Sequence, residues 1–213
     1  MEFQRLLEIV GDEPVFETGL LLAGAVDPAD VRRQLSRWTQ AGRLYQLRRG
    51  VYALAPPFQK VKPHPFLVAN RLQRGSYVSS LSALAYYDLI PEYVAVTTSV
   101  TTGRPARRDT PLGSYEFRHI QSAWWHGYYL LEVSGGQHAF VATPEKALLD
   151  WVYLQPEADR PEALGELRLQ NLHELDLDRL AGGAERAHSP KLLRAAAWVR
   201  ERAAAGPAEY ESV

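Results

Sequence analysis

Basic and amide side chains gather in one segment of the chain, and their types fit the binding of a polyanion. Between Val31 and Lys62 there are eight basic residues and no acid, whereas the formal net charge of the whole chain is −1. Arginine, glutamine and serine donate hydrogen bonds, and guanine edges and DNA phosphates accept them. The segment therefore predicts a nucleic-acid surface. A solvated basic face is the alternative.

Most of these donors fall on one predicted helix, from Pro28 to about Ala41. Asp27 can cap it, and Pro28 suits its first position. Val31, Leu35 and Trp38 share one face and should pack inward. The residues that lie mostly away from this face are predicted to enter the major groove of DNA: Arg32, Arg33, Ser36, Arg37 and Gln40.

A predicted hairpin follows this helix. Strands over 44–47 and 51–54 flank Arg48 and Arg49, with Gly50 at the turn. We expect the two arginines to contact the DNA backbone or minor groove, where the negative potential favours arginine. An exposed hairpin whose arginines serve only solubility is the alternative.

Two earlier helices should position the hairpin and the basic helix. Residues 2–10 repeat apolar side chains at helical spacing. Residues 16–23 fit a short buried helix that stops at Gly24. Three helices followed by a hairpin predict a winged helix-turn-helix DNA-binding domain over residues 1–58.

A Pro-rich linker begins at Ala55 and leads to a second domain, residues 63–213, of mixed helices and strands. The fold class is therefore α+β. Ser79 or Ser80 should cap a helix that runs to Tyr87, and Asp150 is expected on the polar face of a helix capped by Thr143. Other predicted helices cover 66–73, 161–169, 176–180 and 190–205, and strands cover 77–78, 93–100, 115–119, 128–133 and 138–142. Residues 101–108 are expected to form a loop in which Arg104, Arg107 and Arg108 either extend a binding surface or are solvated, and residues after Gly206 are expected to be disordered.

Several classes of function find no support in the sequence. With no cysteine, the chain can form no disulfide, thiolate zinc site or cysteine nucleophile. It has no HExxH motif, no P-loop and no GxGxxG, so we expect no metal, no cofactor and no enzymatic activity.

No apolar run approaches the roughly 20 residues that span a bilayer. Residues 1–10 look like an amphipathic helix and not a signal peptide, so we expect a cytoplasmic protein without a membrane partner.

Several blocks of the sequence together resemble the AbiEi family of antitoxins. They follow a start that ends in RGVY at 49–52, and they lie in the order of that family: YVSSLSALAYYDLIPE at 77–92, TTSVTT at 97–102, TPLG at 110–113, FRHI at 117–120 and ATPEKALLD at 142–150. The resemblance covers roughly residues 1–155. Residues 156–213 are rich in Ala, Arg and Leu and do not match the family.

The resemblance implies a two-part antitoxin of a type IV toxin–antitoxin (abortive infection, phage defence) system. In that family the winged helix binds inverted repeats in promoter DNA and represses its own operon. The second domain neutralises a nucleotidyltransferase-like toxin, with or without binding it directly. Two alternatives stay open: a winged helix that serves as a protein-interaction module, and a general transcriptional regulator without antitoxin activity.

Overall fold

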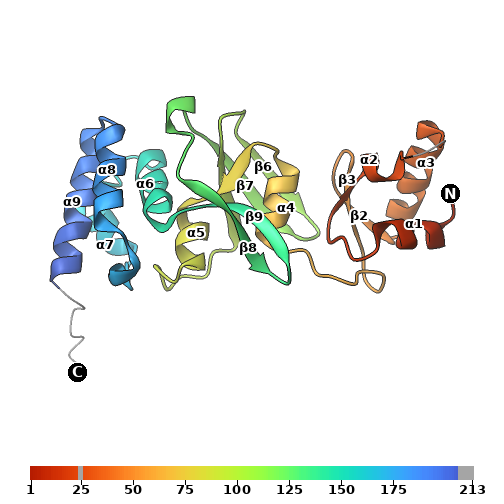
Figure 1. Ribbon diagram of the computed structural model, residues 1–213, viewed down its shortest axis with the longest axis horizontal. Coiled ribbons are helices and arrows are strands. Elements are labelled where there is room, and N and C mark those ends of the chain that lie inside the picture. Colours follow the sequence, from red (N-terminus) through yellow and green to blue (C-terminus); the bar gives the residue numbers. More distant parts are fainter. Residues whose placement is uncertain (24–25, 206–213) are drawn as a thin grey trace, which may run out of the picture.

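Apolar side chains form two clusters, a smaller one within residues 1–58 and a larger one that extends from Val15 to Val199 and so shares the N-terminal hairpin. The computed structural model describes residues 1–23 and 26–205, so the predicted helix stop at Gly24 and the predicted disorder after Gly206 lie outside the described residues. The molecule is elongated, with the N-terminal elements at one end, a β-sheet in the middle and the C-terminal helices at the other end (Figure 1). The architecture is α+β, with helices beside two separate sheets.

The N-terminal elements surround the smaller cluster. They are α1 (Phe3–Val10), β1 (Phe16–Glu17), α2 (Thr18–Leu21), α3 (Pro28–Gln40), β2 (Leu44–Arg48) and β3 (Val51–Leu54). The helix predicted over 16–23 is wrong at its start, because Phe16 and Glu17 pair with Tyr52 and Val51 as a third strand. Phe16 is buried and stacks on the Tyr52 ring at 5.9 Å, so tertiary pairing overrides the helical pattern.

Helix α3 forms as predicted, within one residue at its end. The Asp27 side chain accepts a hydrogen bond from the Ala29 backbone at 2.9 Å and caps the helix. Val31, Leu35 and Trp38 are buried in the smaller cluster. The helix therefore turns one face to the core and leaves the opposite face to solvent.

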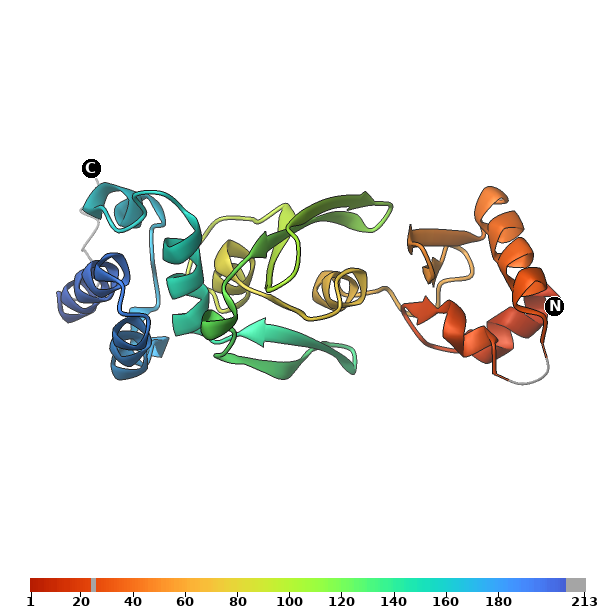
Figure 2. The ribbon, with the colours of Figure 1, turned by 90° about the horizontal axis from the view of Figure 1, so that it is seen from above.

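A curved six-stranded sheet forms the middle of the molecule, in the order β6-β7-β5-β4-β9-β8. Its elements are α4 (Pro65–Leu72), β4 (Ser76–Val78), α5 (Ser80–Tyr86), β5 (Val96–Thr101), β6 (Ala106–Thr110), β7 (Gly113–His119), the 3-10 helix η1 (Ser122–Trp124), β8 (Tyr128–Ser134) and β9 (Gln137–Ala142). Helices α4 and α5 pack against this sheet. The sheet curves around them, so that strands lie on both sides of the two helices (Figure 2).

Two predictions for this region are wrong. The loop expected over 101–108 is only half loop: residues 102–105 lie outside the strands, whereas Arg107 and Arg108 lie in β6 and pair with Glu116 and Tyr115 of β7. As an edge strand, β6 keeps polar side chains in contact with water, so its composition looks like that of a loop. The strand expected from residue 93 begins only at Val96.

The C-terminal elements pack on one another at the far end of the molecule (Figure 1). They are α6 (Pro144–Leu154), α7 (Pro161–Glu166), the 3-10 helix η2 (Leu172–Glu174), α8 (Leu177–Arg186) and α9 (Pro190–Ala204). The Thr143 side chain caps α6 as expected, accepting from the Lys146 backbone at 3.2 Å. Within residues 1–23 and 26–205, no helix combines the length and the apolar content that crossing a bilayer requires.

Substitutions at two neighbouring glycines of α8 test how closely α8 packs against α6. A Cβ atom at Gly183 would stand 2.7 Å from Leu149 Cδ1, whereas one at Gly182 would meet nothing closer than an Arg186 nitrogen at 3.6 Å. We expect Gly183→Ala to destabilise the protein by about 1–3 kcal/mol through overpacking. Gly182→Ala should be neutral or stabilising, since alanine favours a helix by about 1 kcal/mol over glycine. Urea unfolding of both variants measures the difference, and equal stabilities would contradict the packing described.

Candidate functional site

The outer face of α3 brings together all five helix residues that the sequence predicts to contact DNA. Each is exposed: Arg32, Arg33, Ser36, Arg37 and Gln40. They lie opposite the buried face of the helix. Among the described residues, the side chains of Ser36, Arg37 and Gln40 make no hydrogen bond within the molecule, so their donors are directed to solvent.

Two of the arginines contact groups at the start of α3, one a carboxylate and the other a backbone carbonyl. The Arg33 guanidinium lies 3.5 Å from Asp30 Oδ1, and Arg32 Nε donates to the Pro28 carbonyl at 2.9 Å. Burial opposes ionisation of Asp30, but the Met1 ammonium group at 3.4 Å and Arg33 outweigh it and lower the pKa of this carboxyl. Both arginines stay largely exposed, so these contacts do not remove them from a ligand's reach.

The predicted wing residues are arranged differently from the helix residues. β2 and β3 form the expected hairpin, and Gly50 adopts the left-handed conformation (φ 80°) that the turn requires. Arg48, however, donates from Nε to the Arg71 carbonyl of α4 at 3.1 Å. Its guanidinium is thus directed to the middle part of the molecule, and only Arg49 is exposed.

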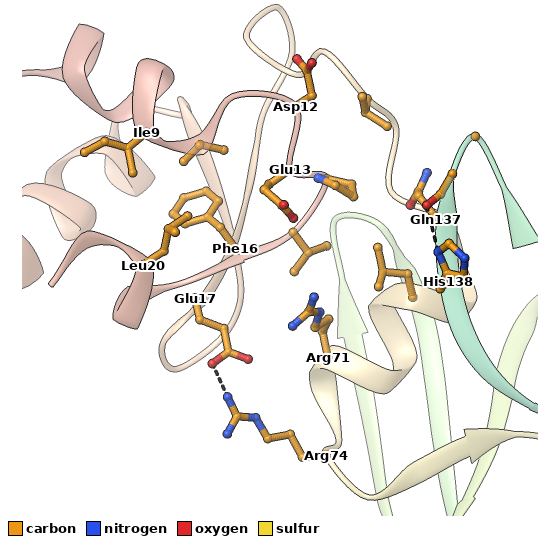
Figure 3. Close-up of a pocket in the computed structure, with 17 residues that line it drawn as sticks. Ile9, Asp12, Glu13, Phe16, Glu17, Leu20, Arg71, Arg74, Gln137 and His138 are labelled. Carbon is orange, nitrogen blue, oxygen red and sulfur yellow. Dashed lines mark hydrogen bonds and ion pairs between the residues drawn. The ribbon is translucent and has the colours of Figure 1, made fainter. Parts of the chain in front are cut away.

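A cleft of about 950 Å³ separates the N-terminal elements from the sheet (Figure 3). Asp12, Glu13 and Glu17 line one wall, and Arg71 and Arg74 line the other. Glu17 and Arg74 form an ion pair across it. This exposed pair contributes little by itself. The hairpin is held against α4 by the Arg48 contact and by the burial of Leu47 and Val51 in the larger cluster.

A second group of polar residues lies buried between the sheet and α6. Asp150 has no exposed side-chain surface, which contradicts its predicted place on a polar helix face. Its Oδ1 accepts from Trp124 Nε1 at 2.7 Å and from Lys146 Nζ. Its Oδ2 accepts from Ser79 Oγ at 2.6 Å and from the Tyr77 hydroxyl at 3.1 Å. Ser79 therefore bonds to Asp150 and does not cap α5 as predicted; Ser80 makes no cap bond either.

Burial and charge shift the pKa values within this cluster. Burial lowers the pKa of Lys146, although the Asp150 carboxylate opposes that shift. Burial and the same carboxylate raise the pKa of Tyr77. The Lys146 ammonium also lies over the Trp124 ring, 4.2 Å from its centroid. Gly127 makes room for the lysine, since a Cβ atom there would stand 3.1 Å from Lys146 Cγ.

The cluster has the residue types of a catalytic site but a closed geometry. The side chains of Lys146 and Asp150 are only 4% and 0% exposed, so both charged groups are buried in this structure. Its role here is to hold α6 against β4 and η1. The sequence contained a signal for it: α6 is apolar nearly all round, so its few polar residues have to be buried and paired.

The described residues also place no group of three or more His, Asp or Glu side chains where they could hold a metal ion.

Removal of the Asp150 charge tests the cluster. Asp150→Asn leaves the Lys146 ammonium buried without a counter-ion, so we expect the free energy of unfolding to fall by roughly 3–5 kcal/mol. Asp178, which is 95% exposed and pairs with Arg200, is a matched control. Asp178→Asn should cost less than about 1 kcal/mol. Equal unfolding midpoints in urea for the two variants would show that the buried pair contributes little.

Comparison with known proteins indicates the fold alone. No protein-family model and no curated protein matches the chain. A solved structure, the crystal structure of the RV2827C protein from Mycobacterium tuberculosis, is similar at 18% sequence identity with a TM-score of 0.50. The match covers 94% of this chain and 80% of that one. The mixed helix and sheet architecture thus occurs in a solved structure, and the similarity extends over nearly the whole chain.

Proposed function

We propose that residues 1–58 form a winged helix-turn-helix that binds promoter DNA through α3. The observation that carries the proposal is the outer face of this helix, where five exposed donor side chains stand opposite a fully packed core face. The order of elements, with a helical segment before α3 and a hairpin after it, supports the proposal. In this function α3 enters the major groove.

Arg37 and Gln40 are the first candidates for reading bases, because the molecule itself does not use their donors. Arg33 can join them at small cost, since breaking its exposed contact with Asp30 costs about 0–1 kcal/mol. Arg32 and Ser36 complete the face. Of the two hairpin arginines, Arg49 is free to bind a phosphate, whereas Arg48 positions the hairpin against α4.

We propose that the second domain, from residue 63 onward, acts as the antitoxin of a type IV toxin–antitoxin operon, which the first domain represses. Support comes from the sequence blocks that resemble the AbiEi family. Two of these blocks supply Tyr77, Ser79, Lys146 and Asp150, four of the five residues of the buried cluster, so the resemblance includes groups that hold the domain together. The proposal assigns the chain no catalytic role. Its functional partner is a nucleotidyltransferase-like toxin, which it neutralises with or without binding it directly.

Alanine at both Arg33 and Arg37 tests the assignment of α3. If each reads a base, each loss costs about 1–3 kcal/mol of specific binding. We expect the double variant to bind a promoter duplex at least tenfold more weakly in a mobility-shift titration. Alanine at Arg194 and Arg200 of α9 removes the same charge far from α3 and should leave binding unchanged. Unchanged affinity in the Arg33 and Arg37 variant would refute the assignment, and no binding by the unmodified chain at low salt would favour a protein-interaction module.

Co-expression tests the antitoxin role separately from repression. The full chain should restore growth to cells that express the nucleotidyltransferase-like protein from the adjacent reading frame. The Arg33 and Arg37 double variant should restore it equally well when an unrelated promoter drives both genes, because the altered face lies in the first domain. Growth arrest that the full chain does not relieve would contradict an antitoxin function. It would not bear on the proposal that α3 binds DNA.

A further inference from the structure

The two edges of the six-stranded sheet differ in their side chains. β6, at one edge, carries Arg107, Arg108 and Asp109 among its five residues, and charged residues on an edge strand discourage pairing with another chain. β8, at the other edge, has Glu132 as its one charged residue, beside tyrosines and leucines. Within residues 1–23 and 26–205, no further strand pairs with the outer edge of β8 (Figure 2). The sheet is thus protected at one edge and open at the other.

Apolar side chains are exposed on both faces of the sheet at this open edge. Leu130 and Phe140 are cross-strand neighbours on one face, and they are 56% and 43% exposed. Tyr129 points to the other face and is 60% exposed. A partner that covered one face would leave the other uncovered. A strand added at the edge would contact both.

The backbone of β8 also has unpaired hydrogen-bonding groups. The Phe140 N–H donates to Asn70 Oδ1 at 2.6 Å and is therefore not available to Leu130, its neighbour in register. The Thr143 N–H donates to the Gly127 carbonyl at 2.9 Å, so the bonded pairs of the β8–β9 ladder fall on the odd-numbered residues of β8. Tyr128, Leu130 and Glu132 therefore direct their N–H and C=O groups to the open edge.

We propose that β8 pairs with β8 of a second copy of this chain, antiparallel around a twofold axis at Leu130. This register sets Leu130 opposite its own copy and Tyr128 opposite Glu132. Each of these pairs exchanges two backbone hydrogen bonds, about six in all. The irregularity between Glu132 and Ser134 ends the pairing.

Side-chain complementarity singles out a second copy as the occupant. Glu132, the one charged residue, faces the Tyr128 side chain and not another carboxylate. Leu130 and Phe140 from both copies meet on one face, and Tyr129 meets Leu131 on the other. The edge of β8 is thus complementary to the same edge of a second copy, as an isologous dimer requires. This inference goes beyond the proposed function, since the dimer forms without DNA.

Sedimentation equilibrium of the full chain without DNA tests the dimer. We expect twice the chain mass of 23.9 kDa over the micromolar range. Leu130→Lys places a charge at the axis and should give the monomer mass. Leu193→Lys, on α9 where the leucine is 42% exposed, should stay dimeric. A monomeric unmodified chain, or a dimeric Leu130→Lys variant, would overturn the proposal.

A cross-link tests the register without adding charge. Because the chain has no cysteine, Leu130→Cys introduces the one thiol. Bonded antiparallel neighbours lie about 5.5 Å apart at Cα, a distance that a disulfide spans, so mild oxidation should give a covalent dimer. Phe140→Cys is the control, since three strand spacings set it about 14 Å from its copy. Equal cross-linking of the two variants, or none in Leu130→Cys, would contradict the pairing.

Discussion

The Asp150 carboxylate lies in the core of the second domain, and a buried charge has to be matched there by donors. Four donors meet this need: Tyr77 from β4, Ser79 directly after it, Trp124 from η1 and Lys146 from α6. One carboxylate thus fixes where α6 lies against the sheet. Helices α8 and α9 pack on α6, and α6 packs on α5, so the carboxylate and these helix contacts together position the C-terminal end.

Apolar packing orients α3 at the N-terminal end. Helix α3 has to cover the small sheet with Val31, Leu35 and Trp38, so its arginines are left on the outside. The hairpin beside it also contacts the middle of the molecule, since Leu47 and Val51 pack into the larger cluster and Arg48 bonds to α4. The linker is held as well, with the Lys62 carbonyl bonded to Gln137 of β9 at 3.0 Å. The proposed DNA-binding domain is therefore anchored to the second domain by several contacts besides the chain itself.

Periodic patterns predicted most of the elements, and tertiary contacts explain the failures. Helix α3, the β2–β3 hairpin and the Thr143 cap follow from spacing and capping residues, and the exposure of the five α3 side chains follows from the same spacing. β1 could not be found, because a two-residue strand exists only through its pairing with β3. The direction of Arg48 depends on α4, which lies far away in the sequence. Asp150 was misplaced because one side of its helix was expected to face solvent, whereas the nearly continuous apolar surface of α6 indicates that its few polar residues are buried.

We propose above all that α3 reads a specific DNA sequence. The most direct measurement is the affinity of the full chain, by fluorescence anisotropy at a fixed physiological salt concentration, for two duplexes of equal length. One carries the inverted repeat of the chain's own promoter, and the other carries the same bases in scrambled order. The account predicts tighter binding to the repeat by a factor on the order of 10³ or more, the lower end for specific regulators. Equal affinity for both duplexes would contradict it, since phosphate contacts alone do not distinguish sequence.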